Sequence, residues 1–363
     1  MSTRTVPVGL DPRYEIHVGP GALGLAGRVL DGRRRVAIVS QAAIAERYLD
    51  AVRAGLPESE VFLMGDGEEA KSFATVERLC RDFAAWGLLR GDAVIALGGG
   101  VVGDTAGFAA SVYYRGVDVV QAPTTLLAQV DAAIGGKTAV NIPEGKNLVG
   151  AFHQPIAVLA DTDTLASLPD REYRGGLGEV AKYALLADPA TEIGGINALL
   201  REHTGAVLAR DPAILGDLVA HCAGMKAAVV VADPHERTGI RATLNLGHTL
   251  AHALETTGGY GLTHGEAVAI GLVFAGELAG AWERVGLDTV DRYQALPASL
   301  GLPTTVPGGE ALRAEDLLAV MRRDKKAAGG LTFVLPGPDG VTLVDDPPAA
   351  ALAHAFAAVG VEG

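Results

Sequence analysis

The stretch AVIALGGGVVG, residues 93–103, decides the fold class. Its first five residues are apolar, as in a buried strand, and Gly98, Gly100 and Gly103 follow with the spacing G-x-G-x-x-G. Glycines between a strand and a helix let the backbone approach a pyrophosphate, and the helix N-terminus offers free N–H groups. The stretch therefore predicts a dinucleotide-binding α/β fold, with a tight strand-to-helix turn as the alternative.

On either side of this stretch, strand and helix patterns alternate up to about residue 175, which is typical of a mostly parallel sheet. Long helical patterns follow it. We expect strands at 35–39, 61–64, 93–97, 117–122 and 156–160, and helices at 69–86, 177–186, 212–231, 241–255, 265–285 and 314–323, with strand-like segments at 331–335 and 341–344. The pattern predicts a Rossmann-like α/β domain over residues 1–175 and an all-α domain over residues 176–363.

Composition narrows the class of protein. The 363 residues carry a formal net charge of −13, which argues against nonspecific binding to nucleic acid or to a membrane surface. The longest apolar run, residues 267–276, is too short to span a bilayer, and residues 1–13 are charged and do not resemble a signal peptide. Cys80 and Cys222 provide neither a disulfide framework nor a cysteine-based zinc site. We therefore expect a cytoplasmic protein.

The cationic residues are unevenly divided between arginine and lysine. Of the 30 cations, 23 are Arg and seven are Lys: Lys71, Lys137, Lys146, Lys182, Lys226, Lys325 and Lys326. A retained lysine can mark a position that needs a compact ammonium group, although codon bias and chance are the alternative. Several of these lysines adjoin glycine-rich turns. Together with Arg115 and Arg241, they indicate a pocket for phosphate and carboxylate oxygens.

Four polar residues, Arg241, Asn245, His248 and His252, have the spacing i, i+4, i+7 and i+11. On one continuous helix they would form a narrow stripe on an otherwise apolar surface. Buried polar groups need partners, so the stripe predicts a metal, an anion or a water-filled site. An internal hydrogen-bond network is the alternative.

His264 lies within Thr263–Glu266, which fits a capping box at the start of a helix. The dipole at a helix N-terminus favours a neutral imidazole, the form that binds a metal. Glu179 could add a carboxylate to His248 and His264, because two histidines and one carboxylate are a common catalytic zinc set. The three residues are too far apart in the sequence for spacing alone to place them together.

Several longer motifs carry a family resemblance. They occupy residues 14–23, 98–116, 123–141, 145–155, 176–183, 241–255, 264–272 and 323–326. In these segments the chain closely resembles the 3-dehydroquinate synthases, members of the sugar phosphate cyclases, and the resemblance covers nearly the whole chain. Leu250-Ala251 stands where that family often has Phe-Gly, and Gly178 stands where Ala is common. Both departures are interpreted as packing changes.

The resemblance implies NAD and a divalent metal, Zn²⁺ or Co²⁺, in specific places. The implied metal ligands are Glu179, His248 and His264. The implied cofactor contacts are Glu68, Lys71, Gly99, Gly100, Val101, Asp104, Thr124, Thr125, Asp131, Lys137 and Lys146. The implied substrate contacts are Arg115, Lys137, Lys146, Asn147, Lys182, Lys226, Arg241, Asn245, His252 and Lys325. Among these, catalytic roles are implied for Lys137, Glu179, Lys182, Arg241, Asn245 and His252.

The resemblance also implies a reaction. The family converts a small anionic sugar acid phosphate, 3-deoxy-arabino-heptulosonate 7-phosphate, to 3-dehydroquinate and phosphate through transient oxidation, elimination, reduction and aldol closure. A homodimer is expected by the same resemblance. Valiolone-type cyclases tend to lack the second histidine of the stripe, and His252 is present here. An amino-dehydroquinate synthase and a metal-dependent polyol dehydrogenase remain alternatives, whereas a noncatalytic binding module would not explain the metal, cofactor and anion motifs together.

Overall fold

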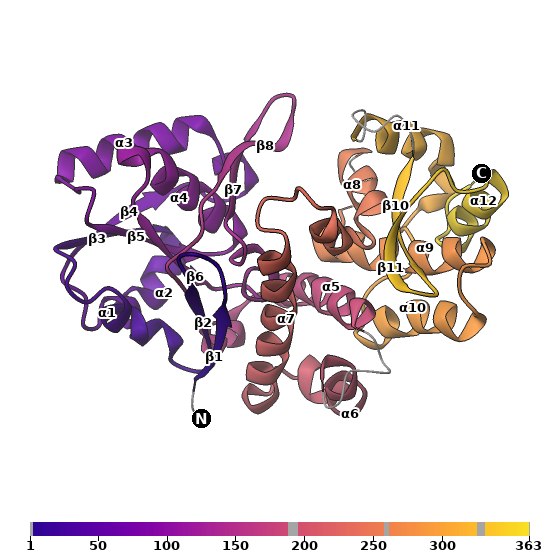
Figure 1. Ribbon diagram of the computed structural model, residues 1–363, viewed down its shortest axis with the longest axis horizontal. Coiled ribbons are helices and arrows are strands. Elements are labelled where there is room, and N and C mark those ends of the chain that lie inside the picture. Colours follow the sequence, from indigo (N-terminus) through magenta and orange to yellow (C-terminus); the bar gives the residue numbers. More distant parts are fainter. Residues whose placement is uncertain (1–2, 188–194, 258–260, 325–330, 363) are drawn as a thin grey trace. The chain divides into compact units, whose positions relative to one another are not determined.

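A seven-stranded sheet forms the centre of the N-terminal part of the chain (Figure 1). The computed structural model describes residues 3–187, 195–257, 261–324 and 331–362. The strand order is β1-β2-β9-β6-β5-β3-β4, and every neighbouring pair is parallel except β1 and β2. The strands are β1 Arg4–Val8, β2 Tyr14–Val18, β3 Arg35–Gln41, β4 Glu58–Met64, β5 Ala93–Gly98, β6 Asp118–Pro123 and β9 Ala157–Ala160. The predicted parallel α/β class is confirmed.

Strand β5, which lies between β6 and β3 in the interior of the sheet, is buried along its whole length, which explains its uninterrupted apolar sequence. Val94 and Ala96 belong to the core on one face of the sheet, together with α3 (Phe73–Trp86) and α4 (Gly100–Val112). The alternate residues of β5 belong to the core on the other face, beneath η1 (Ala22–Leu25), α1 (Ala26–Val29) and α2 (Ala42–Arg53). Helices therefore cover both faces.

All five predicted strands of this part of the chain lie within one residue of observed strands or inside them. The predicted helix 69–86 is divided into a short turn, η2 Glu68–Ala70, and α3, because Ser72 caps α3 by accepting a hydrogen bond from the Thr75 amide at 3.3 Å. The hairpin of β7 (Lys137–Ile142) and β8 (Gly145–Phe152) was not predicted, because its residues read as a glycine-rich turn.

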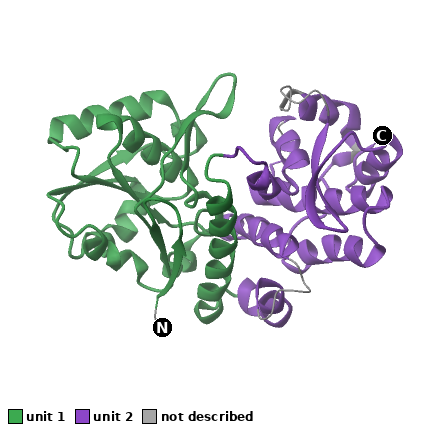
Figure 2. Cartoon of the chain, in the orientation of Figure 1, with its two compact units in different colours: residues 1–169, 209–235 green, residues 170–208, 236–363 purple. Residues whose placement is uncertain are grey.

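The chain divides into two compact units (Figure 2). The first contains Met1–Pro169 and Ala209–His235, and the second contains Asp170–Leu208 and Glu236–Gly363. The first unit therefore includes α7 (Pro212–Ala232), which contacts β1, β2, η4 (Ala128–Ala132) and η5 (Thr162–Ser167). Among the described residues, α7 is the one helix long and apolar enough to cross a membrane, but half of it is buried in the fold, as expected for a core helix.

The second unit is built around α9 (His264–Ala281), which contacts α5 (Asp170–Leu186), α8 (His248–Thr257), α10 (Leu287–Ser299), α12 (Ala349–Ala358) and β10 (Thr332–Gly337). Most residues of α9 are buried, so its sequence is apolar on all sides. The remaining elements are α6 Ile196–Leu208, η6 Ile240–Asn245, η7 Gly309–Ala311, α11 Ala314–Asp324 and β11 Gly340–Asp345. The helical class is confirmed, and the β10–β11 hairpin lies at the predicted strand-like segments.

Candidate metal centre and nucleotide loop

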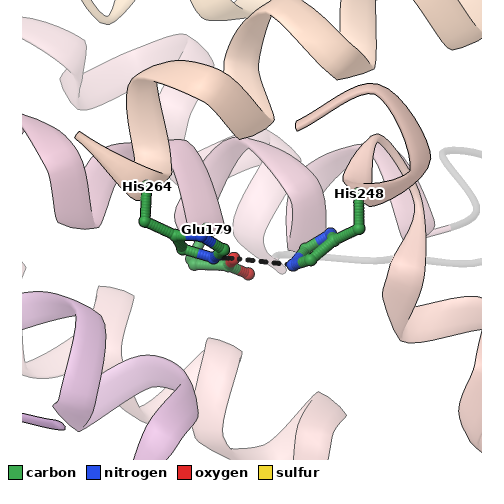
Figure 3. Close-up of side chains that lie close together, drawn as sticks. All are labelled: Glu179, His248 and His264. Atoms are coloured by element: carbon green, nitrogen blue, oxygen red, sulfur yellow. Dashed lines mark ion pairs between the residues drawn. The ribbon is translucent and has the colours of Figure 1, made fainter. Parts of the chain in front are cut away.

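Three side chains from separate helices of the second unit meet at one point (Figure 3). Glu179 lies in α5, and His248 and His264 are the first residues of α8 and α9. The Oε1 atom of Glu179 is 3.4 Å from Nε2 of His248 and 3.3 Å from Nε2 of His264. One ligand atom from each residue lies within 4.8 Å of the other two. The structure thus brings together the three residues that the resemblance implies as metal ligands.

Each of these three residues adjoins a glycine that touches another backbone. A Cβ atom on Gly178 would lie 2.1 Å from the Gly265 carbonyl oxygen, and one on Gly265 would lie 1.6 Å from the Gly175 carbonyl oxygen. A Cβ on Gly271 would lie 1.9 Å from the carbonyl oxygen of Gly247, which precedes His248. Because these positions lack side chains, α9 approaches both α5 and the start of α8 closely enough to bring the ligands together.

The side-chain atoms that face away from the cluster are also held. Lys182, one turn after Glu179 in α5, forms an ion pair with Oε2 of Glu179. The Nδ1 atom of His248 lies 3.1 Å from the Leu246 carbonyl oxygen. The Nδ1 atom of His264 lies 3.3 Å from Oε1 of Glu255. Each imidazole can therefore keep its proton on Nδ1 and present the lone pair of Nε2 to the cluster.

The charges around the cluster shift its pKa values in different directions. Burial alone would raise the pKa of Glu179, but Lys182 and the two histidines hold it well below its usual range. Burial lowers the pKa of His248. Burial also opposes protonation of His264, but hydrogen bonds and charges from Glu179 and Glu255 outweigh it and raise the pKa to about 10. Without a metal, the two carboxylates therefore outweigh the preference of the helix N-terminus for a neutral imidazole, and a bound cation would displace the proton of His264.

Two imidazole nitrogens and one carboxylate oxygen make a donor set that fits Zn²⁺ or Co²⁺. Three protein ligands leave a coordination position for a substrate oxygen. The buried carboxylate would be neutralised by a cation, and both Nε2 atoms already face it. The residues present thus fit a catalytic divalent metal.

The predicted polar stripe does not lie on one helix. Residues 240–245 form the 3₁₀-helix η6, and the chain turns at Gly247, with φ of +79°, before α8 begins at His248. The prediction of a continuous helix over 241–255 is wrong because the left-handed backbone at Gly247 interrupts it. His252 still lies beside the cluster, with its ring edge-on to His248 at 5.4 Å between centroids. Arg241 is buried, and Asn245 is exposed.

The predicted nucleotide loop in the first unit has the expected strand–turn–helix context. Gly98 ends β5, Gly99 precedes α4, and Gly100 is the first residue of α4. A Cβ on Gly98 would lie 2.6 Å from Val102, and one on Gly103 would lie 2.8 Å from Gln121. Packing therefore accounts for these two glycines. Gly99, Gly100 and Val101 are half-buried and form the N-terminal end of α4, where the first backbone N–H groups of a helix are available to an anion.

Other implied cofactor residues surround this loop. The Thr124 amide donates to the Gly98 carbonyl at 2.9 Å, so Thr124 and Thr125 follow β6 at the same edge of the sheet. Asp104 lies in α4 and accepts a hydrogen bond from Lys71. Asp131 accepts a hydrogen bond from Lys226 at 2.7 Å. The first unit thus contains residues that the resemblance implies for the cofactor, in contact with one, Lys226, that it implies for the substrate.

Lys71 connects the helix that follows the predicted nucleotide loop to the β7–β8 hairpin. Its ammonium donates to Asp104 and to the Asn147 side chain, while the Asn147 amide donates to Asn141 at 2.9 Å. Asn141 in turn donates to Glu68 at 2.8 Å. Asn141 and Glu255 were not identified from the sequence. Glu255 follows His248 by seven residues, and this helical spacing could have placed both side chains on one face of a helix.

The remaining implied residues are distributed over both units. Arg115, Lys137 and Lys146 are exposed on the first unit, which also contains Lys226, whereas Lys182, Arg241 and Asn245 belong to the second. Lys325, and with it the end of the 323–326 motif, lies outside the described residues.

Comparison with known proteins identifies the family. Residues 61–175 match the family model described as 3-dehydroquinate synthase N-terminal, and residues 176–327 match the one described as 3-dehydroquinate synthase C-terminal. The chain is 47% identical to a 3-dehydroquinate synthase of Caulobacter vibrioides, over 92% of each chain. It is 45% identical to a putative aminodehydroquinate synthase of Amycolatopsis mediterranei, over 95% of this chain and 92% of that one.

Among solved structures, the 2-epi-5-epi-valiolone synthase ValA of Streptomyces hygroscopicus, determined with NAD⁺ and Zn²⁺, matches with a TM-score of 0.84. The two proteins are 27% identical, and the match covers 95% of this chain and 96% of ValA. The architecture of both units is therefore that of the sugar phosphate cyclases. With two family models spanning most of its length and relatives at this level of identity, the chain belongs to the 3-dehydroquinate synthase family.

Proposed function

We propose that the protein is a 3-dehydroquinate synthase. It converts 3-deoxy-arabino-heptulosonate 7-phosphate to 3-dehydroquinate and phosphate, with NAD and a divalent Zn²⁺ or Co²⁺ ion as cofactors. The observation that carries this proposal is the cluster of Glu179, His248 and His264, with the ammonium group of Lys182 beside it. A metal beside an anion-binding lysine suits a phosphorylated hydroxy acid better than a simple alcohol.

The metal and the nucleotide have separate tasks. When bound, the ion supplies a Lewis acid for a substrate oxygen and NAD supplies a reversible hydride acceptor. Glu179, His248 and His264 hold the ion. Glu68, Lys71, Gly99, Gly100, Val101, Asp104, Thr124, Thr125, Asp131, Lys137 and Lys146 are proposed to hold the nucleotide.

The protein's own side chains bind the anionic substrate and transfer protons. Arg115, Lys146 and Lys182 are proposed to bind the phosphate, and Lys137, Lys226 and Arg241 the carboxylate and nearby hydroxyls. Asn147, Asn245 and Lys325 complete the proposed substrate contacts. His252 is proposed to transfer protons, because its ring adjoins that of His248 and is exposed.

The decisive experiment follows three products at once. The protein is incubated with NAD, Zn²⁺ or Co²⁺ and the heptulosonate phosphate, while phosphate, dehydroquinate and NADH absorbance are recorded. Equal amounts of phosphate and dehydroquinate with no accumulation of NADH are expected, because the substrate is oxidised only transiently. Steady accumulation of NADH from simple polyols, with no phosphate release, would identify a dehydrogenase instead.

A second candidate is an aminodehydroquinate synthase, favoured by the 45% identity to the Amycolatopsis mediterranei protein of that name. Its substrate retains the carboxylate and phosphate and differs by an amino group, so the same anion-binding residues would serve. The ratio of kcat/KM values for the two heptulosonate phosphates distinguishes the candidates. A ratio above one hundred in favour of the amino analogue would replace the first proposal with the second.

We further propose a cytoplasmic homodimer, which the family resemblance supports. Light scattering after size-exclusion chromatography tests the oligomeric state. An elution mass near 37.2 kDa, that of one chain, would contradict the dimer.

A further inference from the structure

Glu255 connects the two helices that carry the histidines of the cluster. It lies in α8, seven residues after His248 and on the same face of that helix. Its Oε1 atom is 3.3 Å from Nδ1 of His264, the first residue of α9. A carboxylate on the helix of one histidine therefore contacts the ring of the other.

The two imidazoles are held by partners of different charge. The Nδ1 atom of His248 contacts a neutral backbone carbonyl, that of Leu246, which adjoins α8. The Nδ1 atom of His264 contacts an anionic side chain from another helix. A hydrogen bond to a carboxylate is roughly twice as strong as one between neutral groups, and it makes the opposite ring nitrogen a stronger donor to a metal.

Exposure makes this partner more important for His264 than for His248. The side chain of His264 is 33% exposed, compared with 11% for His248 and 2% for Glu179. Packing alone therefore restrains the His264 ring least of the three. A hydrogen bond at Nδ1 stops the ring from turning, and it keeps Nε2 directed at Glu179.

We propose that Glu255 is a positioning residue of the metal centre: it accepts the Nδ1–H hydrogen bond of His264, orients the ring and strengthens metal binding. This inference rests on the metal site of the proposed function. The Glu255 carboxylate also supplies a second negative charge near the cation, in addition to that of Glu179. This charge is opposite in sign to that of the Lys182 ammonium group. Both effects act before any substrate binds.

Metal affinity of the full-length protein tests the inference. Metal-stripped parent, Glu255→Gln and Glu255→Ala proteins are titrated with Zn²⁺ against a chromogenic chelator, and the visible spectrum is recorded with Co²⁺. We expect about 10- to 100-fold weaker zinc binding in Glu255→Ala, the range typical of outer-shell partners. Glu255→Gln should fall between parent and Glu255→Ala, because its amide oxygen accepts the same hydrogen bond without the charge. The Co²⁺ bands should shift in both variants.

The same unit offers a matched control. Glu277 of α9 also pairs with a histidine, His354 of α12, at 3.0 Å between Oε2 and Nε2, but away from the cluster. Glu277→Gln removes a carboxylate from a histidine in the same way, and it should leave zinc affinity and the Co²⁺ spectrum unchanged. A loss in this control equal to that in Glu255→Gln would overturn the inference.

Zinc affinity of Glu255→Ala within twofold of the parent would also overturn it. If Glu255→Ala does not fold, as judged by circular dichroism, Glu255→Gln decides: a loss of threefold or more supports the inference, and an unchanged affinity contradicts it. The titration contains neither NAD nor substrate. A parent protein that binds zinc but forms no dehydroquinate would therefore contradict the proposed function while leaving the role of Glu255 intact.

Discussion

The predicted nucleotide loop and the candidate metal centre are built in opposite ways. The loop consists of β5, three glycines and α4, which follow one another within about twenty residues of sequence. The candidate metal centre takes one residue from each of three helices, and Glu179 and His264 lie 85 residues apart in the sequence. A local arrangement needs the right turn residues, whereas a dispersed one needs correct helix packing. Substitutions should therefore affect the two sites differently.

The largest effect is expected at a metal ligand. His264→Ala removes one of three donor atoms, so zinc binding should weaken by more than the roughly 100-fold loss typical of an outer-shell partner, and turnover should fall to background. Metal content per chain after dialysis measures the effect. His354→Ala, which removes an exposed histidine of the same unit, is the control. Full metal occupancy in His264→Ala would remove this residue from the ligand set.

The next effect separates a neighbour of the metal from a ligand. His252→Ala should retain its metal and its NAD binding, while kcat falls by about 10²–10⁴-fold, the usual contribution of general acid–base catalysis. Metal analysis and steady-state kinetics on the same sample measure both quantities. His252→Ala protein that is isolated without metal would show that the edge-on ring beside His248 belongs to the metal centre itself.

A third prediction compares helix packing with loop packing. Gly265→Ala would place a Cβ 1.6 Å from the Gly175 carbonyl oxygen, so α5 and α9 would have to separate. We expect the free energy of unfolding to fall by about 3 kcal/mol, and zinc affinity to fall with it. Chemical denaturation and zinc titration measure the two losses.

Two alanine variants sharpen this comparison. In Gly103→Ala, in the predicted nucleotide loop, the new Cβ would meet a side-chain atom of Gln121, which can move. The free energy of unfolding should therefore fall by less than in Gly265→Ala, and zinc affinity should not change. Gly205→Ala in α6 would meet nothing within 4 Å, and it should stabilise the protein by up to about 1 kcal/mol. Equal losses in the free energy of unfolding for Gly265→Ala and Gly103→Ala would contradict the proposed difference between the two sites.

The last prediction concerns pH. The pKa of His264 is raised to about 10 by Glu179 and Glu255, whereas that of His248 is lowered. Above the pKa of His248 and below pH 10, a metal ion must therefore displace one proton, from His264, and none from His248. Zinc affinity should rise about tenfold per pH unit between pH 6 and 8. Chelator competition at three pH values measures the slope, and an affinity independent of pH would contradict this assignment of the proton.

Much of the fold follows from local patterns. Apolar runs predicted five of the seven strands of the large sheet, β3, β4, β5, β6 and β9, because a strand buried on both faces is continuously apolar, whereas β1 and β2 were not predicted. The β7–β8 hairpin was missed because its sequence is polar and glycine-rich, and its strands are defined by pairing with each other. Gly247 likewise ends a helical pattern that residue spacing alone extended from 241 to 255.

The candidate site also has one part that local sequence predicts and another part that it does not. The glycine spacing of the nucleotide loop is visible in eleven residues, 93–103. The meeting of Glu179 with His248 and His264 depends on backbone contacts between glycines of different helices, which spacing cannot show. Family resemblance supplied those ligands before the structure placed them together. The spacing places Glu255 on the same helical face as His248, but its contact with His264 on the next helix became visible only in three dimensions.

The return of α7 to the first unit has a consequence for synthesis of the chain. A ribosome releases β1 and β2 long before residues 209–235, yet α7 packs against both strands. A nascent chain of 169 residues therefore contains every strand of the sheet, but β1 and β2 still lack the helix that packs against them. The first residues of the second unit, 170–208, are also synthesised before α7. Completion of the first unit must wait for later translation, and a fragment cut at residue 175 should aggregate unless the missing helix is supplied separately.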